Sequence, residues 1–214
     1  IYQNAEKLDR ALSNIKICDP AIGSGAFPVG LLHEIVSARK VLRKHLSESY
    51  LKNLVVEDST DLTDYYFKRH AIQNSIYGVD IDASAIDIAR LRLWLSMIVD
   101  EEDYGTIDAL PNLDYKIVCG NSLIGLPENA MRDLNVEAEL EKLKELFFHE
   151  TDETKKKTLR HNINQKIRQL LDSAETFAGY QIHFDFKLFF SEVWHEKNGF
   201  DVVIGNPPYI KSRS

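Results

Sequence analysis

The sequence predicts an α/β fold, with a doubly wound, mainly parallel sheet and an α-helical hairpin inserted into it. Short β-branched runs alternate with helix-length stretches whose apolar residues recur every three or four positions, which is the pattern of βαβ units. Polar and glycine residues follow directly after these runs. Because open α/β sheets bind ligands beyond the carboxyl ends of their strands, we expect a ligand site there.

Composition and charge narrow the class of protein. The chain has 214 residues, of which 44% are hydrophobic and 28% charged, and its net charge is −7. These values exclude disordered, collagen-like and disulfide-rich proteins. The apolar runs are far shorter than the roughly 20 residues of a membrane span, and no signal pattern opens the chain, so we expect a cytoplasmic protein with no membrane partner. The acidic balance weighs mildly against nucleic acid as a partner of these residues alone.

The cysteines and the chain ends lead to two further expectations. Cys18 and Cys119 end β-branched runs without the spacing of metal ligands. They are therefore predicted to be buried thiols of a reducing compartment, and no metal site is expected. The chain begins at Ile1 and ends soon after an apolar run, so we interpret it as part of a longer protein.

The first third of the chain alternates helix and strand. The expected elements are an amphipathic helix over 1–14, a strand over 15–18 that Pro20 stops, a helix from Pro28 to about 45 and a helix from about 61 to 72. Residues 48–59 are ambiguous.

The next elements complete the predicted sheet. A strand over 75–79 is closed by Asp80, and a helix opens at Asp82 or Ala83. Its apolar face is predicted to contain Ile86, Ala89, Leu93 and Met97, widened by Ile88, Leu91 and Leu95. Further strands are expected over 115–119 and 200–204.

A charged segment separates the last two strands. Residues 128–178 contain 20 charged residues in 51, which predicts two solvated helices, about 131–149 and 152–174, packed as a hairpin. A structural or partner-facing appendage is the favoured interpretation, and contact of Lys155–Lys157 with DNA phosphates is the alternative. The aromatic residues within 180–195 are interpreted as packing residues, although their period of two also fits a strand.

The first candidate site segment is the loop Asp19–Phe27. Gly23 and Gly25 permit a tight turn and let a ligand lie on bare backbone. The loop lacks the Gly-Lys-Ser/Thr ending of a phosphate-binding loop, and Pro28 replaces the third glycine of a dinucleotide fingerprint. Asp19 suits a ligand with a positive group, and a plain tight turn is the alternative.

Two further segments follow the second and third strands. Asp80 can accept hydrogen bonds from both hydroxyls of a ribose, and a second helix cap is the alternative. Asp82 is better explained as the cap of the next helix. Asn121 can bond the edge of an adenine ring, or it can be a turn residue.

The fourth segment, Phe200–Tyr209, is the most specific. The side-chain oxygen of Asn206 and the carbonyl of Pro207 can both accept hydrogen bonds from one exocyclic amino group. The consecutive prolines fix the backbone there. Tyr209 offers a face on which a planar base can stack.

With these four segments in order, the chain resembles the S-adenosylmethionine-dependent amino-methyltransferases of DNA. The Asp19–Phe27 loop is similar to their cofactor loop and Asn206–Tyr209 to their catalytic Asn-Pro-Pro-Tyr motif. A cofactor loop that precedes the catalytic motif is typical of their gamma group. The long helical insertion and the Gly199–Ile210 run are most similar to large restriction-modification enzymes that methylate N6 of adenine.

The resemblance implies roles for individual residues. Asp19, Gly23, Gly25 and Phe27 would line the methionine end of S-adenosylmethionine, within a cofactor loop that includes Pro20, Ala21 and Ser24. Asp80 would hold the ribose hydroxyls and Ile81 would pack on the cofactor adenine. Asn121 stands where the family often has Asp. The catalytic residues would be Asn206, Pro207, Pro208 and Tyr209.

The resemblance also implies a Rossmann-like fold and a reaction. Residues 1–127 would form the cofactor-binding half of an incomplete methyltransferase fold, 128–178 the helical insertion, and 179–214 a strand with the catalytic motif. A methyl group would pass to the amino group of a base flipped out of double-stranded DNA. The DNA would be bound mostly by regions outside this chain. We expect the chain alone to bind cofactor weakly and not to methylate DNA.

Several alternatives remain open. The same acceptors suit the N4 amino group of cytosine, and some methyltransferases of RNA or of protein glutamine also carry Asn-Pro-Pro-Tyr. A non-catalytic scaffold whose hairpin binds a partner belongs to a different class. The family's strand order would place the second strand between the strands of Cys18 and Cys119, beyond the reach of a disulfide.

Overall fold

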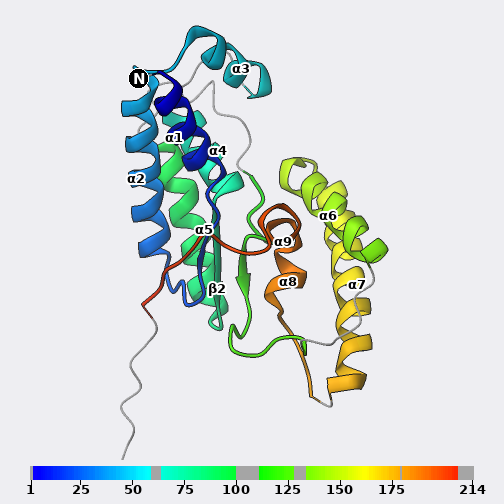
Figure 1. The fold of residues 1–214 in the computed structure, drawn as a ribbon. Coiled ribbons are helices and arrows are strands. Elements are labelled where there is room, and N and C mark those ends of the chain that lie inside the picture. Colours follow the sequence, from blue (N-terminus) through cyan, green and yellow to red (C-terminus); the bar gives the residue numbers. More distant parts are fainter. Residues whose placement is uncertain (1, 59–63, 100–110, 128–133, 179, 207–214) are drawn as a thin grey trace, which may run out of the picture.

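The structure, a computed structural model, describes residues 2–58, 64–99, 111–127, 134–178 and 180–206. Within these residues one sheet contains four parallel strands in the order β3-β2-β1-β4. They are β1 (Ile17–Asp19), β2 (Ile76–Asp80), β3 (Ile117–Cys119) and β4 (Val202–Val203). Helices lie on both sides of the strands (Figure 1). The predicted α/β, doubly wound fold is confirmed.

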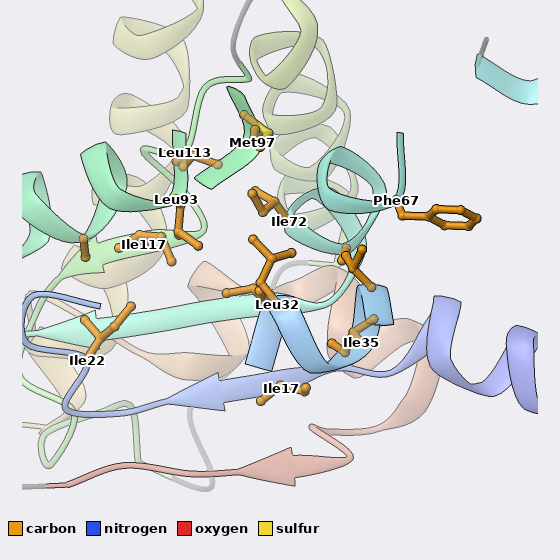
Figure 2. Close-up of a cluster of buried hydrophobic side chains, with 14 of the residues drawn as sticks. Ile17, Ile22, Leu32, Ile35, Phe67, Ile72, Leu93, Met97, Leu113 and Ile117 are labelled. Carbon is orange, nitrogen blue, oxygen red and sulfur yellow. The ribbon is translucent and has the colours of Figure 1, made fainter. Parts of the chain in front are cut away.

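One face of the sheet is covered by α2 (Ala26–Arg43), α4 (Asp64–Asn74) and α5 (Ala83–Ile98). The other two helices that precede β3 are α1 (Tyr2–Asn14), which packs on α2 and α4, and α3 (Glu48–Asp58). Ile17 and Ile117 of the sheet pack with Leu32 of α2, Ile72 of α4 and Leu93 of α5 (Figure 2). Burial of these aliphatic side chains holds the helices against the strands.

The opposite face is covered by helices from the segment between β3 and β4. They are α6 (Leu134–His149), α7 (Glu153–Ala178), α8 (Phe186–Phe189) and α9 (Ser191–Lys197). Cys18, Tyr77 and Val118 share this second core with Leu140 of α6 and Ile163 of α7. Neighbouring strand residues thus serve different cores, because successive side chains point to opposite faces.

Most predicted elements are present with small shifts at their ends. The third and fourth strands are shorter than expected, at 117–119 and 202–203. The ambiguous region 48–59 contains α3. The aromatic segment forms α8 and α9 rather than a strand, and its Phe184, Phe189 and Phe190 are buried, as the packing interpretation predicted.

The predicted wide apolar face of α5 is wrong. Ile88, Leu91 and Leu95 are each about half exposed, at 46%, 51% and 46%. At 3.6 residues per turn they lie on the side of the helix opposite the buried Leu93. The apolar residues of α5 therefore occupy two faces, of which only one meets the sheet.

The prediction of two buried thiols is half wrong. Cys18 is buried in β1, but Cys119 is exposed. Cys119 is the last residue of β3, which has a neighbour on only one side in the described sheet, and its Sγ lies 3.5 Å from the carbonyl oxygen of Ile81. Both cysteines are free, and β2 separates their strands as the expected strand order required.

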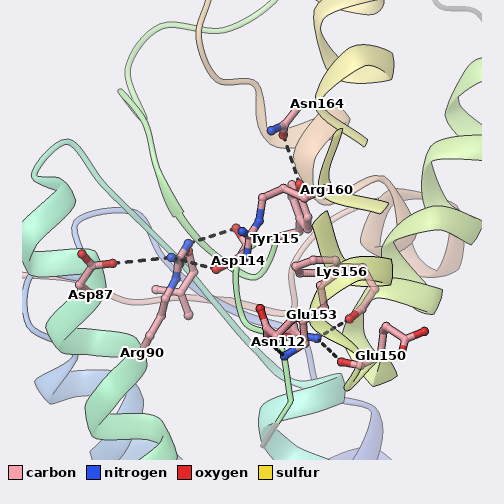
Figure 3. A network of polar contacts seen from close by, with 12 residues as sticks. Asp87, Arg90, Asn112, Asp114, Tyr115, Glu150, Glu153, Lys156, Arg160 and Asn164 are labelled. Carbon is pink, nitrogen blue, oxygen red and sulfur yellow. Dashed lines mark hydrogen bonds and ion pairs between the residues drawn. The ribbon is translucent and has the colours of Figure 1, made fainter. Parts of the chain in front are cut away.

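A polar network joins α7 to the rest of the molecule (Figure 3). Asp114 pairs with Arg90 of α5 at 3.0 Å and with Arg160 of α7 at 2.7 Å. Tyr115 donates its hydroxyl hydrogen bond to Asn164 of α7 at 3.1 Å. One carboxylate thus connects helices from both faces, which fixes α7 beside the start of β3.

Among the described residues, no helix combines the length and the apolar character that crossing a membrane requires.

Candidate functional site

The turn after β1 is pinned to the neighbouring strand. The N–H of Ile22 donates to the carbonyl of Val79 at 2.9 Å, and the N–H of Gly25 donates to the carbonyl of Ile22 at 2.9 Å. A Cβ on Gly78 would lie 2.2 Å from the Ile22 side chain, so Ile22 packs directly on the backbone of β2. This close approach fixes the turn over the carboxyl end of the sheet.

The two predicted glycines have left-handed backbones, with φ values of 52° at Gly23 and 83° at Gly25. This conformation disfavours residues with a Cβ. A Cβ on Gly25 would lie 3.1 Å from the backbone of Ala89 in α5, whereas one on Gly23 would meet no atom within 4 Å. Gly25 thus serves packing, and Gly23 presents bare backbone to open space.

Asp80 bridges the end of β2 and the glycine turn. Its Oδ2 accepts the N–H of Gly23 at 2.8 Å, and its Oδ1 accepts the N–H of Asp82 at 3.0 Å. Asp82 in turn caps α5 by accepting the N–H of Ser84 at 2.8 Å, which confirms its predicted role. Among the residues that the structure describes, the groups that orient the Asp80 carboxylate are therefore backbone N–H groups.

Asp19 is a buried carboxylate beside Asp80. It is 2% exposed, and its Oδ1 accepts the N–H of Ala21 at 3.0 Å. Burial raises the pKa of Asp19, and the nearby charge of Asp80 raises this pKa further, while the bond from Ala21 opposes both effects. A positively charged group beside Asp19 would offset this cost.

The fourth strand brings the candidate catalytic segment to the same place. Ile204 donates its N–H to the carbonyl of Cys18 at 3.0 Å. A Cβ on Gly205 would lie 2.9 Å from Oδ1 of Asp19. Asn206 follows and is exposed. Pro207, Pro208 and Tyr209 lie outside the described residues.

The third segment has a clear local role. The side-chain oxygen of Asn121 accepts the N–H of Leu123 at 3.0 Å, which is the turn contact that was the alternative to ligand binding. The preceding Gly120 donates its N–H to the carbonyl of Asp80 at 2.8 Å. Asn121 is therefore at the predicted edge, with its oxygen engaged in the turn.

The remaining predicted residues border this edge. Phe27 is 43% exposed and Ile81 is 73% exposed, so both present apolar surface. Pro20, Ala21 and Ser24 are half-buried in the turn. The structure thus brings Asp19, the glycine turn, Asp80 and Asn206 together at one edge of the sheet.

Comparison with known proteins assigns the family. The family model described as "Eco57I restriction-modification methylase" matches residues 74–214. The chain belongs to this methylase family.

Two curated relatives carry related names. RM.MjaORFECS2P of Methanocaldococcus jannaschii, a candidate type II restriction enzyme and methyltransferase, is 36% identical over 129 residues, which cover 58% of this chain and 10% of that protein. RM.Eco57I of Escherichia coli, a type II restriction enzyme and methyltransferase, is 32% identical over 126 residues, which cover 55% of this chain and 12% of that protein. The methylase chain thus spans about a tenth of the length of these relatives. No solved structure is significantly similar to it.

Sequence reasoning missed one residue that shapes the site of this methylase. Asp185 is buried, and its carboxylate accepts the N–H of Leu126 at 2.9 Å and that of Leu188 at 3.0 Å. It thereby ties the loop after β3 to α8. Its position directly before a short helix signals a cap, but nothing in the sequence signals the contact with Leu126.

A cavity of about 470 Å³ lies at the amino-terminal ends of the strands of the methylase sheet, at the end opposite the candidate site. Lys16 pairs with Glu196 at 2.8 Å and Lys144 with Glu192 at 3.1 Å. The Nζ of Lys116 lies 3.9 Å from the centre of the Tyr77 ring. Burial lowers the pKa of this lysine to about 8. These pairs connect α6 and α9 to the sheet and are far from the carboxyl edge.

Among the residues that the structure describes, no group of three or more His, Cys, Asp or Glu side chains is arranged to hold a metal ion.

Proposed function

We propose that this chain is the cofactor-binding and catalytic part of a DNA methyltransferase that transfers a methyl group from S-adenosylmethionine to N6 of adenine in a restriction-modification system. The supporting observation is the convergence of Asp19, the Gly23–Asp80 contact and Asn206 at one edge of a parallel sheet. In this proposal residues 1–127 hold the cofactor, 128–178 form an insertion, and 179–214 carry the catalytic motif.

The residues at the edge fit the cofactor. Asp19 is a buried carboxylate that a cationic methionine end would neutralise. Each oxygen of Asp80 accepts one backbone N–H, which leaves lone pairs for two ribose hydroxyls. Gly23 has open space where a side chain would stand. Ile81 offers exposed apolar surface for the adenine ring.

The reaction needs orientation of a weak nucleophile. S-adenosylmethionine supplies an electrophilic methyl group on its sulfonium. Asn206 and the Pro207 carbonyl would accept hydrogen bonds from the adenine amino group, which aims the nitrogen lone pair at the methyl carbon and stabilises the charge that develops. Tyr209 would stack on the flipped base. These roles rest on the resemblance and the family.

The first experiment tests the cofactor. Calorimetric titration of the purified protein with S-adenosylmethionine should give saturable binding that Asp80→Asn removes. Asp82→Asn is the matched control, because Asp82 caps α5 through its own oxygen and has no proposed ligand contact. Equal affinity of wild type and Asp80→Asn would contradict the proposed role of Asp80.

The second experiment tests the substrate. The full-length gene product is incubated with labelled S-adenosylmethionine and duplex DNA, and the digested nucleosides are separated. We expect label in N6-methyladenine, and its loss in Asn206→Ala. Label in N4-methylcytosine would refute the choice of base, and label confined to RNA or protein would refute the substrate class.

A further inference from the structure

The two helices of the inserted hairpin, α6 and α7, differ in the sign of their charged side chains. Residues 154–171 of α7 contain six Lys or Arg and no Asp or Glu, within a chain of net charge −7. Helix α6 instead carries four Glu and two Lys. A helix whose charged side chains serve only to keep the protein soluble normally carries both positive and negative charges. The acid-free stretch of five turns therefore needs a specific explanation.

Five of the basic and amide side chains of α7 form an exposed stripe along the helix. It contains Lys157, Arg160, His161, Asn164 and Arg168, which follow the helical spacing i, i+3, i+4, i+7 and i+11, and all five are exposed. We call these residues the α7 stripe. The buried Ile163, Ile167 and Leu170 lie next to the stripe around the helix, so the stripe borders the packed face of α7. The stripe is about 16 Å long at 1.5 Å per residue.

The stripe is held in place at its centre. Arg160 is fixed by Asp114 at 2.7 Å, and Asn164 accepts a bond from Tyr115 at 3.1 Å. A hollow of about 440 Å³ lies at this point and is lined by Arg90, Asp114, Tyr115, Arg160 and Asn164 among others. Figure 3 shows the side chains of these residues. Because the anchored residues do not need to be ordered on binding, the stripe is pre-organised for a ligand.

The ends of the stripe differ in their partners. Arg168 pairs with Asp172 and lies 3.6 Å from Glu175. For Lys157, by contrast, no carboxylate within 4.0 Å is found among the described residues. The uncompensated positive charge of the stripe therefore lies at Lys157, while the paired guanidinium groups of Arg160 and Arg168 keep further N–H donors.

The C-terminal end of α7 approaches the candidate site. Glu175 accepts the N–H of Ile182 at 2.9 Å, and Tyr180 donates to the carbonyl of Gly125 at 3.0 Å. Gly125 belongs to the loop that follows β3 at the carboxyl edge. The stripe therefore leads along the domain toward the edge where the catalytic motif begins.

We propose that the α7 stripe contacts the sugar–phosphate backbone of the DNA substrate. This inference rests on the proposed function. Lys, Arg and Asn side chains are the usual donors to phosphate oxygens, and such contacts position DNA without reading its sequence. At 3.4 Å per base pair, the stripe matches the length of about five base pairs. Its role is to orient the duplex relative to the site.

The test is the salt dependence of DNA binding by the full-length gene product. The variant Lys157→Gln with Arg168→Gln removes two positive charges from exposed helix positions. The logarithm of the affinity for a fluorescent duplex is measured against the logarithm of salt concentration. Each lost phosphate contact reduces the magnitude of this negative slope by about 1. We therefore expect a reduction of about 1 for Lys157→Gln alone and of about 1–2 for the double variant, because Arg168 also pairs with Asp172.

A second double variant separates local from net charge. Lys44→Gln with Lys52→Gln makes the same charge change at exposed positions beyond α2 and in α3, on the other face of the sheet. We expect its slope to equal that of the wild type. The inference is overturned if the stripe variant keeps the wild-type slope, or if the control variant lowers the slope equally.

The two proposals fail in distinguishable ways. A wild-type protein that methylates DNA while the stripe variant keeps its slope refutes only the inference about the stripe, and a stripe that binds an acidic protein segment would give this result. A wild-type protein that neither binds nor methylates DNA refutes the proposed function, and the inference with it.

Discussion

Substitution of Gly25 by alanine should destabilise the protein through two separate effects. At a φ of 83° a residue with a Cβ costs about 1–2 kcal/mol. The new Cβ would also lie 3.1 Å from both Cα and Cβ of Ala89. Ala89 is fully buried in α5, so relief requires movement of a helix backbone, and overpacking of this kind costs about 1–3 kcal/mol. The expected total is about 2–5 kcal/mol.

Two other glycines of the same region provide matched controls. Gly30 is exposed in the second turn of α2, and a Cβ there meets no atom within 4 Å. Gly30→Ala should therefore stabilise the protein by about 0.5–1 kcal/mol. Gly23→Ala has the left-handed backbone without the close contact, so it should cost only about 1–2 kcal/mol.

Urea denaturation of the purified protein measures all three changes as differences in the free energy of unfolding at constant m value. The expected order of stability is Gly30→Ala, wild type, Gly23→Ala, Gly25→Ala. A cost for Gly25→Ala no greater than that for Gly23→Ala would refute the steric part of the reasoning. Cofactor titration adds a second distinction, because Gly23→Ala should weaken S-adenosylmethionine binding while the protein remains folded.

Three further predictions concern charge and burial. Because the pKa of Asp19 is raised, titration across pH should show cofactor affinity falling on acidification at a higher pH than an ordinary Asp allows, and Asp19→Asn should flatten that dependence. Iodoacetamide should alkylate Cys119, more slowly with S-adenosylmethionine bound, but not Cys18, whose burial raises its pKa to about 12; peptide mass spectrometry showing equal labelling would contradict this. Asp9→Asn should cost about 3–5 kcal/mol in urea denaturation, because it leaves Arg39 buried without its counter-ion; a cost below about 1 kcal/mol would show that the pair is dispensable.

Features fixed by neighbouring residues could be predicted from the sequence. The glycine turn after β1 and the cap at Asp82 each depend on a few consecutive residues, and both are present in the structure. The side on which a helix packs is harder to predict when apolar residues surround it. In α5 the sequence offers Leu93 and Leu91 equally, and only the position of the sheet decides that Leu93 is buried.

Contacts between distant residues could not be predicted. Gly23 and Asp80 are 57 positions apart, and Leu126 and Asp185 are 59 apart. In each case a carboxylate binds a backbone N–H that any residue type except proline would offer. No pattern in the sequence identifies such a partner, because the donor carries no side-chain signature. The exposure of Cys119 is likewise a property of its place at the end of an edge strand.

The contacts of Asp80 link the fold of the site to its proposed use. Its two oxygens accept the N–H groups of Gly23 and Asp82, so the carboxylate is oriented before any ligand binds. An ionised carboxylate has about four acceptor positions, and two are occupied. The remaining two match the two hydroxyls of a ribose in number. In Asp80→Asn one acceptor becomes a donor that faces a backbone N–H, so the turn and the ribose contact should be lost together. Asp82→Asn changes the neighbouring cap and leaves the carboxylate of Asp80 intact. Because of the coupling at Asp80, the comparison of these two variants is the informative one.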